Sequence, residues 1–442
     1  MNEVPSTGES GVFKAPDFAE LDRRRPTIAS ITADTYAAVL AGGRGTRLAQ
    51  LTSWRAKPAV PFGGKHRIID FALSNCINSG VRRIGVATQY KAHSLIQHLR
   101  RGWNFLDSHR QEFLDVLPAQ QRVREGWYDG TADALYQNID ILRMQSPRHV
   151  LVLAGDHVYK MDYGQMLAEH VERGADLSIA CIEVPVRSAA AFGVLGVDDD
   201  GRVRSFAEKP AQPPAMPGNP ARALVSMGVY AFDAGGLYAG LRKDASRTDS
   251  THDFGRDVIP RMLEDGARVY AHHFAESCVN MVNGHPYWRD VGTVDAYWEA
   301  NMDLTRVQPD LNMYDPLWPI RTLEEHLPPA KFVFASPDAR GQTFEALVSS
   351  GCIVSGASII RSLLFTSVIV ERDSVIEDSM LLPEVRVGRG VRLRRVIVDK
   401  LCVLPDGFTA GFDRAADAAR YHVTEQGVVL ITPEMLGQSL HD

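Results

Sequence analysis

The sequence predicts an α/β fold in which a mostly parallel sheet covered by helices is followed by a parallel β-helix. Strand-like and helix-like patterns alternate from residue 35 to about 300. An apolar run at the start of this region breaks into glycines, as a buried strand does at a sharp turn. The last hundred residues instead repeat an aliphatic residue at steps of five or six. We therefore expect a polar extension (1–34), an α/β domain (35–300), a connector (301–345) and a β-helix domain (346–442).

The first expected element is a buried strand that ends in a glycine-rich loop, within residues 36–48 (YAAVLAGGRGTRL). The loop contains Gly42, Gly43, Arg44, Gly45, Thr46 and Arg47. Glycine lets the backbone approach an anion closely, and guanidinium groups add charge-assisted, forked hydrogen bonds. The loop lacks the Lys-Ser/Thr pair of a P-loop and the third glycine of a dinucleotide fingerprint. It indicates another kind of polyphosphate site or, taken alone, a turn with two solvated arginines.

Further elements follow in order along the α/β region. We expect a helix over 67–79, a strand over 81–88, a helix over 90–100, a strand over 150–154 and a hairpin of strands 194–197 and 203–206. Gly80 suits the end of the first helix, and residues 198–201 carry a hairpin turn signal. Residues 210–220 are rich in proline and predict a surface loop. Ligands of such a sheet gather at the carboxyl ends of its strands, so we expect the functional site there.

The carboxyl-terminal region repeats apolar side chains with small or turn residues between them. These positions are Ile353, Ile359, Phe365, Val370, Ile376, Leu382, Val387, Leu393, Val398 and Leu404. A six-residue aliphatic period is typical of a parallel β-helix, in which each short strand stacks on the next coil. A β-sandwich is the alternative, because apolar-rich sequence matches a loose period easily.

Composition and charge exclude several classes of function. The net charge of −6 and the lack of a dense basic tract argue against general nucleic-acid affinity. No apolar stretch approaches the ~20 residues of a membrane-spanning helix, and the start of the chain lacks a signal-peptide layout. The cysteines are odd in number and scattered, which favours reduced thiols; they are Cys76, Cys181, Cys278, Cys352 and Cys402. We expect a cytoplasmic protein without a membrane or nucleic-acid partner.

Three residues are candidates for a phosphate and metal site. Lys57 follows the glycine-rich loop by about ten residues and could reach the same phosphates as a point charge. Asp156 ends a buried strand, and Asp290 lies in the segment YWRDVGT. Two carboxylates that face a polyphosphate suit Mg²⁺, a hard cation that prefers oxygen ligands. Each aspartate could instead be a simple turn residue or helix cap.

Two other segments carry polar groups for which the sequence allows both a binding role and a purely structural one. Glu208 could accept hydrogens from sugar hydroxyls while Lys209 holds a monoester phosphate, although a solvated surface pair is the default. Residues 129–133 (DGTAD) form either a turn with a helix cap or a glycine contact under a purine ring. The 14 histidines show no metal-binding pair and no Ser-His-Asp order, so we treat them as structural. The chemistry indicated is phosphoryl or nucleotidyl transfer.

Seven blocks of the sequence, taken together and in order, resemble bacterial glucose-1-phosphate adenylyltransferases. They are LAGGRGTRL, RAKPAVPFGGKHRIIDFALSNCINSG, GWYDGTADALYQN, LAGDHVYKMDY, EKP, HDFGRD and YWRDVGT. The resemblance runs from about residue 36 to the end of the chain. It implies transfer of AMP from ATP to α-D-glucose 1-phosphate, giving ADP-glucose and pyrophosphate, the committed and allosterically regulated step of bacterial glycogen biosynthesis. It also implies a homotetramer whose Rossmann-like domain is followed by a left-handed β-helix.

The same resemblance implies roles for individual residues. These are catalytic Arg44, Arg47, Lys57 and Asp156; nucleotide-binding Gly42, Gly43, Thr46, Gln89 and Gly130; glucose-1-phosphate-binding Tyr128, Gly193, Glu208, Lys209 and Ser226; Mg²⁺-binding Asp156 and Asp290; and allosteric Arg55, Arg67, Glu384 and Lys400.

Regulation is where the sequence departs from the family pattern. Members activated by fructose 1,6-bisphosphate carry cations at the positions of Trp54, Pro433 and Gly437, which are uncharged here. The family's inhibitory AMP site is only partly kept; its positions match Arg55, Pro61, Arg67, Met144, Glu384 and Lys400. A bisphosphate is poorly held without paired cations. We therefore expect an anionic effector, a sugar phosphate or AMP, that binds between the domains and differs from fructose 1,6-bisphosphate.

Three alternative functions remain open at this point. The first is the same transfer with UTP or glucosamine 1-phosphate, and the second is a non-catalytic regulatory subunit. The joint presence of Arg44, Lys57, Asp156 and Asp290 argues against the second. The third, an acyltransferase built on the β-helix, lacks a catalytic histidine, since residues 353–404 contain none.

Overall fold

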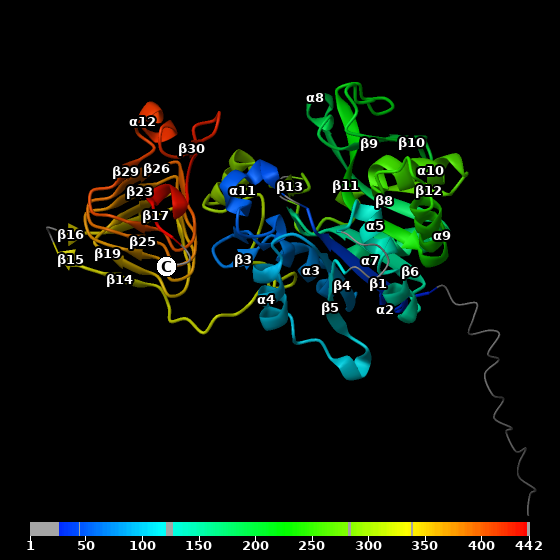
Figure 1. Ribbon diagram of the computed structural model, residues 1–442, viewed down its shortest axis with the longest axis horizontal. Helices are drawn as coiled ribbons and strands as arrows, with labels where there is room; N and C mark the ends of the chain where they lie inside the picture. The colour runs from blue at the N-terminus through cyan, green and yellow to red at the C-terminus, as the bar shows by residue number, and fades with distance from the viewer. Residues whose placement is uncertain (1–25, 44, 121–126, 282–283, 337–338, 440–442) are drawn as a thin grey trace, which may run out of the picture.

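The computed structural model describes residues 26–43, 45–120, 127–281, 284–336 and 339–439. An α/β domain and a β-helix lie side by side, with the β-helix on the left in Figure 1. The predicted fold class is confirmed. Among the described residues, no helix combines the length and the apolar character needed to cross a membrane.

The centre of the α/β domain is a sheet in the order β10-β9-β11-β6-β1-β4-β5, with β8 beside β11 and β12 beside β8. Its strands are β1 (Thr35–Ala41), β4 (Arg83–Thr88), β5 (Phe113–Pro118), β6 (His149–Ala154), β8 (Leu177–Pro185), β9 (Gly193–Val197), β10 (Val203–Glu208), β11 (Arg222–Asp233) and β12 (Val269–His273). β1 pairs in parallel with β4 and β6, and β4 with β5. β11 runs antiparallel to β6 and β8, and β9 and β10 form the predicted hairpin.

Helices cover both faces of this sheet. One face packs against α2 (Ile28–Ala33), α3 (Ile69–Asn78), α4 (His93–Gly102) and α7 (Tyr163–Glu172). The other packs against α5 (Thr131–Tyr136), α6 (Ile139–Met144), α9 (Ala234–Ala245) and α10 (Ile259–Glu264). Shorter elements are η1 (Thr46–Thr52), η2 (Lys57–Ala59), η3 (Ser108–Arg110), η4 (Phe254–Val258), η5 (Phe274–Glu276), α8 (Val186–Ala189), β2 (Pro61–Phe62), β3 (His66–Arg67), β7 (His157–Tyr159) and β13 (Trp288–Asp290).

The helix and strand predictions for this domain are confirmed, with small shifts at the boundaries. α3 falls within the predicted helix, and Gly80 follows it with φ +86°, where a side chain would be strained. α4 begins three residues later than predicted. Lys91 before it has φ +47°, outside the helical region.

The β-helix consists of three stacks of short parallel strands. They are β14 (Lys331–Val333), β19 (Ile353–Ser355), β22 (Ile369–Val370), β25 (Arg386–Val387) and β28 (Val403–Leu404); β17 (Gln342–Phe344), β20 (Ser358–Ile360), β23 (Val375–Glu377), β26 (Arg392–Arg394) and β29 (Thr409–Ala410); and β18 (Leu347–Val348), β21 (Leu363–Leu364), β24 (Met380–Leu381), β27 (Val396–Val398) and β31 (Val429–Ile431). Beside them lie β15 (Ala335–Ser336), β16 (Ala339–Arg340), β30 (His422–Val423), α12 (Arg414–Ala418) and η6 (Glu434–Leu436).

The pairing register shows how the coils stack. Ile369 pairs with Arg386, and Arg386 pairs with Val403, so successive coils are 17 residues apart. Three strands per coil explain the step of five or six in the sequence, and all three stacks are consistent with a left-handed β-helix. The β-sandwich alternative is wrong. β14 and β17 already belong to these stacks, although they fall in the segment predicted as a connector.

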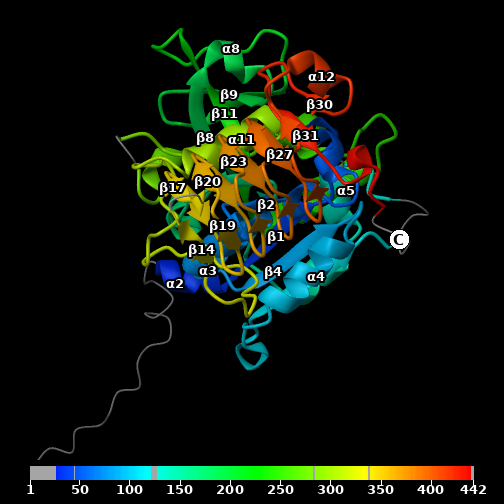
Figure 2. The ribbon, with the colours of Figure 1, turned by 90° about the vertical axis from the view of Figure 1, so that its left-hand side faces the viewer.

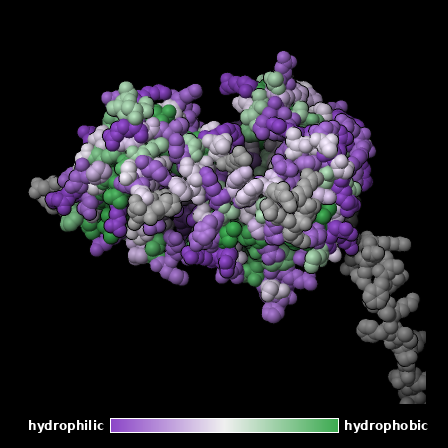
Figure 3. All heavy atoms as spheres, viewed as in Figure 1, coloured by the Kyte–Doolittle hydropathy of each residue, from purple (hydrophilic) through white to green (hydrophobic). Residues whose placement is uncertain are grey.

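The two domains share a hydrophobic core. Residues of 48–71 and of α11 (Val294–Asp303) pack against the side chains that the β18-β21-β24-β27-β31 stack turns away from the interior of the β-helix. The indole of Trp298 on α11 donates a hydrogen bond to the Asp378 carbonyl (2.9 Å), and the Arg395 guanidinium lies 4.3 Å from the Trp298 ring centroid. Figure 2 looks onto the β-helix with the α/β domain behind it, and Figure 3 shows the surface hollowed between the two domains at the top of the view.

Acid should destabilise the fold through the buried His170 on α7, which is 1% exposed. Burial and the neighbouring His149 lower the pKa of His170 from 6.5 to about 4. The unfolded chain therefore binds a proton between these values that the folded chain does not, so stability is full above pH 6.5 and falls as the pH drops. Between pH 7.5 and 5.0 we expect the titration of this histidine to lower the free energy of unfolding by about 2 kcal/mol.

Urea unfolding at the two pH values, compared between the native chain and His170→Gln, measures this contribution. Glutamine does not titrate, so the variant should lose less stability on acidification. An equal loss in both proteins would contradict the assignment.

Candidate active site

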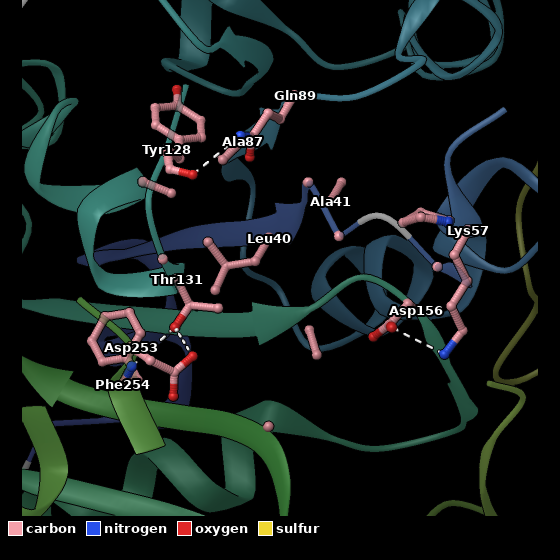
Figure 4. Close-up of a pocket in the computed structure, with 18 of the residues that line it drawn as sticks. Leu40, Ala41, Lys57, Ala87, Gln89, Tyr128, Thr131, Asp156, Asp253 and Phe254 are labelled. Carbon is pink, nitrogen blue, oxygen red and sulfur yellow. Dashed lines mark hydrogen bonds and ion pairs between the residues drawn. The ribbon is translucent and has the colours of Figure 1, made fainter. Parts of the chain in front are cut away.

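A cavity of about 920 Å³ opens at the carboxyl edge of the sheet. Because β1, β4 and β6 are parallel, the residues that follow them meet at this edge. Ten of the predicted site residues line the cavity: Gly42, Gly43, Thr46, Arg47, Lys57, Gln89, Tyr128, Gly130, Asp156 and Glu208. Figure 4 shows Lys57 and Asp156 at one side, Tyr128 and Gln89 at another, and Asp253 and Phe254 at a third.

The glycine-rich loop packs directly onto Lys57. Gly45 has φ +62°, and a Cβ at this position would lie 3.0 Å from the Cβ of Lys57, so the turn requires glycine. Arg47 follows in η1 with a side chain that is 61% exposed, and its Nη2 lies 3.5 Å from an Asp290 carboxylate oxygen. Its charge is therefore available to a ligand. Arg44 lies outside the described residues.

Lys57 links the two predicted metal ligands. Its Nζ donates to Asp156 Oδ2 (3.0 Å) and to Asp290 Oδ1 (2.7 Å), while its side chain is only 5% exposed. Asp156 follows β6, and Asp290 ends β13, which pairs with β7 just after Asp156. This pairing carries Asp290 to the edge of the sheet where the glycine-rich loop lies.

The charges of this cluster stabilise one another. Burial by itself would raise the pKa of the Asp156 carboxyl, but Lys57, with His157 and Arg47, outweighs it and holds that pKa well below its ordinary value. Burial would likewise lower the pKa of Lys57, but the two carboxylates raise it overall. Lys57 and Asp156 are therefore both charged at neutral pH.

The cluster also has the chemistry of a divalent cation site. Two carboxylate oxygens approach a single cationic nitrogen within about hydrogen-bond distance, and hard cations prefer such oxygen ligands. In the structure the Lys57 ammonium is the cation between them. Asp156 and Asp290 fit a divalent ion if Lys57 moves toward a phosphate.

Glu208 lies at the end of β10, in a recess formed by two glycines. A Cβ on Gly193 would lie 2.9 Å from its carboxylate, and a Cβ on Gly255 would lie 2.7 Å from it. Lys209 pairs with Glu208 at 2.9 Å but is 54% exposed. The Ser226 hydroxyl donates to the Tyr230 hydroxyl (3.3 Å) and accepts from the Gly228 N–H (3.2 Å). Gly193 and Lys209 thus lie beside Glu208 and Ser226 lies beside Tyr230, and none of the three is among the residues that line the cavity.

Gln89 and Tyr128 meet on a different side of the cavity. The Gln89 amide donates to the Tyr128 carbonyl oxygen at 3.1 Å. The Tyr128 hydroxyl is turned into the protein, where it accepts from Asn138 (2.8 Å). Gly130 has a packing role besides lining the cavity, since a Cβ there would come within 2.2 Å of the His252 carbonyl oxygen.

Sequence reasoning missed the cavity residues Thr131, Asp253 and Phe254. The Thr131 hydroxyl donates to Asp253 (3.0 Å) and accepts from the Phe254 N–H (2.9 Å), as Figure 4 shows. The block HDFGRD contains Asp253 and Phe254 and was a signal for them. It suggested no role, because Thr131, the partner of Asp253, lies 122 residues away in the sequence.

The four predicted allosteric residues lie elsewhere, where the domains meet. Arg55 donates to Asp399 across the boundary at 2.8 Å, and both side chains are 4% exposed. Burial lowers the pKa of Lys400, and the nearby charges of Arg55 and Arg67 lower it further, while Asp399 and, less strongly, Glu384 oppose them. Arg67 donates to the Ala59 carbonyl (2.8 Å), at the end of the turn that begins with Lys57.

Another cluster in the described part of the chain could hold a metal ion: Glu169, His272 and Glu276, whose ligand atoms lie within 4.8 Å of one another. Both ring nitrogens of His272 already have partners, Glu169 (2.5 Å) and the Ser277 hydroxyl (2.8 Å). Arg173 also pairs with Glu169 (2.8 Å). Protein contacts therefore account for Glu169 and His272.

The fold and the site together define a nucleotidyl transferase. A family model described as "Nucleotidyl transferase" matches residues 36–307, and one described as "GlmU-like, C-terminal hexapeptide" matches residues 328–431. A glucose-1-phosphate adenylyltransferase of Nitrosomonas europaea is 61% identical over 94% of this chain and 96% of its own length. One of Methylobacillus flagellatus is 59% identical over 94% and 97%. The chain belongs to the glucose-1-phosphate adenylyltransferase family.

Proposed function

We propose that this chain transfers the adenylyl group of ATP to α-D-glucose 1-phosphate. A phosphate oxygen of the sugar ester attacks the α-phosphorus, the bond from that phosphorus to the bridging oxygen breaks, and ADP-glucose and pyrophosphate form. The observation that carries the proposal is the joint placement of Lys57, Asp156 and Glu208 in one cavity. The family relationship supports the choice of substrates.

The phosphate side of the cavity would hold the triphosphate. Asp156 and Asp290 would bind Mg²⁺, which when bound offsets the negative charge of the triphosphate. Lys57 and Arg47 would screen the departing pyrophosphate as preorganised charges. The N–H groups of Gly42 and Gly43 would contact phosphate oxygens.

The sugar side would hold glucose 1-phosphate. The Glu208 carboxylate accepts hydrogen bonds only, so it suits sugar hydroxyls, and the exposed Lys209 ammonium beside it suits the monoester phosphate. That phosphate has a second pKa near 6 and is largely ionised at neutral pH, so no general base is needed. The protein's task is to align two anions that repel each other.

A pyrophosphate-release assay with the purified chain tests the function. ATP should react with glucose 1-phosphate far faster than UTP does, and faster than ATP reacts with glucosamine 1-phosphate. A preference for UTP or for the amino sugar would replace the substrates named here. No turnover with any pair would support the regulatory-subunit alternative.

We also propose that Arg55, Arg67 and Lys400 bind an anionic effector at the domain boundary, with the carboxylate of Glu384 nearby. Nη1 of Arg55 is buried without a hydrogen-bond partner among the described residues. An anion placed among the three cations would relieve their mutual repulsion and pair with this nitrogen. Arg55 lies just before Lys57 in the chain, and Arg67 donates to the Ala59 carbonyl of the same turn. A movement of either arginine can therefore displace Lys57 in the active site.

Lys400→Met should weaken the response to the effector by at least about tenfold, the cost of one charge-assisted contact. Activity titrations with fructose 6-phosphate, AMP and fructose 1,6-bisphosphate measure the concentration for half response. Lys331→Met, an exposed lysine of β14, is the control. An unchanged response in Lys400→Met would remove the cluster, and strong activation by micromolar fructose 1,6-bisphosphate would contradict the choice of effector.

A further inference from the structure

We propose that His252 is a positioning residue that fixes the position of two walls of the cavity relative to each other. The first wall is residues 128–131, and the second is residues 253–255. The proposal rests on the proposed function, since its effect is measured on that reaction.

The backbone of His252 has a conformation that is uncommon among residues other than glycine. Its φ is +55°, in the left-handed region that favours glycine and asparagine. Its carbonyl oxygen accepts from the Ala132 N–H (2.8 Å) and, more weakly, from the Asp133 N–H (3.4 Å). Among the described residues no side chain caps this end of α5, so the His252 carbonyl satisfies amides that the helix leaves open.

The side chain of His252 anchors this conformation through Asp244. Its Nδ1 hydrogen-bonds to Asp244 Oδ2 at 2.7 Å, and His252 is 7% exposed. Asp244 on α9 is held in turn by Ser250 (2.6 Å) and by Arg261 of α10 (2.9 Å). The imidazole therefore ties the turn to two helices.

The anchored turn touches both walls of the cavity. On one side, its carbonyl lies against Gly130, where a Cβ would come within 2.2 Å of it. On the other side, His252 leads directly into Asp253 and Phe254, which bond to Thr131, and into Gly255, which packs against Glu208. Loss of the anchor should let the two walls shift relative to each other.

Three variants test this role. His252→Gly permits the left-handed backbone but removes the anchor, so kcat/KM for ATP and for glucose 1-phosphate should each fall about 10- to 100-fold, as small misplacements do. His252→Asn tolerates the same backbone and keeps a donor, and should recover part of the loss. Asp244→Asn removes the anchoring carboxylate and should resemble His252→Gly. His109→Gly, an exposed histidine in η3, is the control.

The double variant His252→Gly/Asp244→Asn separates positioning from general stability. If the two side chains act as a pair, its kinetic loss should be less than the product of the single losses. Losses confined to thermal stability, with both kcat/KM values within twofold of the native chain, would overturn the proposal. A loss for one substrate alone would contradict the coupling of the walls. If His252→Gly does not fold, His252→Asn and Asp244→Asn decide by the same criteria. Absence of ADP-glucose synthesis by the native chain would instead disprove the proposed function.

Discussion

Asp156→Asn should lower turnover by at least about 100-fold, the typical cost of losing a preorganised charge contact. Asparagine keeps the size of the side chain but removes one of the two carboxylates that face Lys57. The pair that would hold the divalent ion then becomes a single acid. We expect the Mg²⁺ concentration for half-maximal activity to rise as well, because the ion loses a charged ligand.

Pyrophosphate release at saturating substrates, repeated over a Mg²⁺ titration, measures both effects. Asp199→Asn, on the exposed turn between β9 and β10, is the matched control. Near-normal turnover of Asp156→Asn with an unchanged Mg²⁺ requirement would remove Asp156 from the site.

Lys57→Met should reduce turnover to a similar degree and also change how the free enzyme responds to Mg²⁺. Methionine fills the buried space without a charge, so Asp156 and Asp290 would face each other without the ammonium that now lies between them. Burial opposes ionisation of Asp156, and in the native chain the Lys57 charge offsets this effect. Without the ammonium the pKa of Asp156 should therefore rise. A divalent ion would then be the cation that relieves the repulsion.

Thermal unfolding with and without Mg²⁺, in the absence of nucleotide, tests this second effect. Because a ligand that binds only the folded state raises the midpoint, Mg²⁺ should stabilise Lys57→Met more than it stabilises the native chain. Lys65→Met, whose exposed lysine pairs with Glu324, is the control. Equal stabilisation of both proteins would show that Lys57 does not occupy the cation position, and undiminished turnover would exclude a catalytic role.

The architecture could be predicted from the sequence because its signals are local. The apolar run of β1, the helix-like pattern of α3 and the five- or six-residue period of the β-helix each depend on residues that lie close together in the chain. Periodicity reports which face of an element is buried, and burial dominates folding. Boundaries were less accurate, as at α4, where a positive φ at Lys91 delays the helix.

The composition of the site was predicted in part. Glycines, Lys57 and the two aspartates were found because their chemistry suits a triphosphate, and parallel strands bring their carboxyl ends to one edge. No role was assigned to Asp253 or Thr131, because the role of each depends on the hydrogen bond between them, which forms only in the folded chain. For Gly130 the sequence left open a turn with a helix cap or a contact under a purine ring, and the structure shows that the His252 carbonyl leaves no room for a Cβ there.

The sequence by itself therefore determined the fold class, the family resemblance and the residue types that carry the chemistry. Only the tertiary structure decided which of them meet. Lys57 bonds to residues 99 and 233 positions away, and Arg55 to one 344 positions away. Such contacts are set by how sheets and domains pack, and no local pattern encodes the distance between atoms that the chain brings together only when it folds.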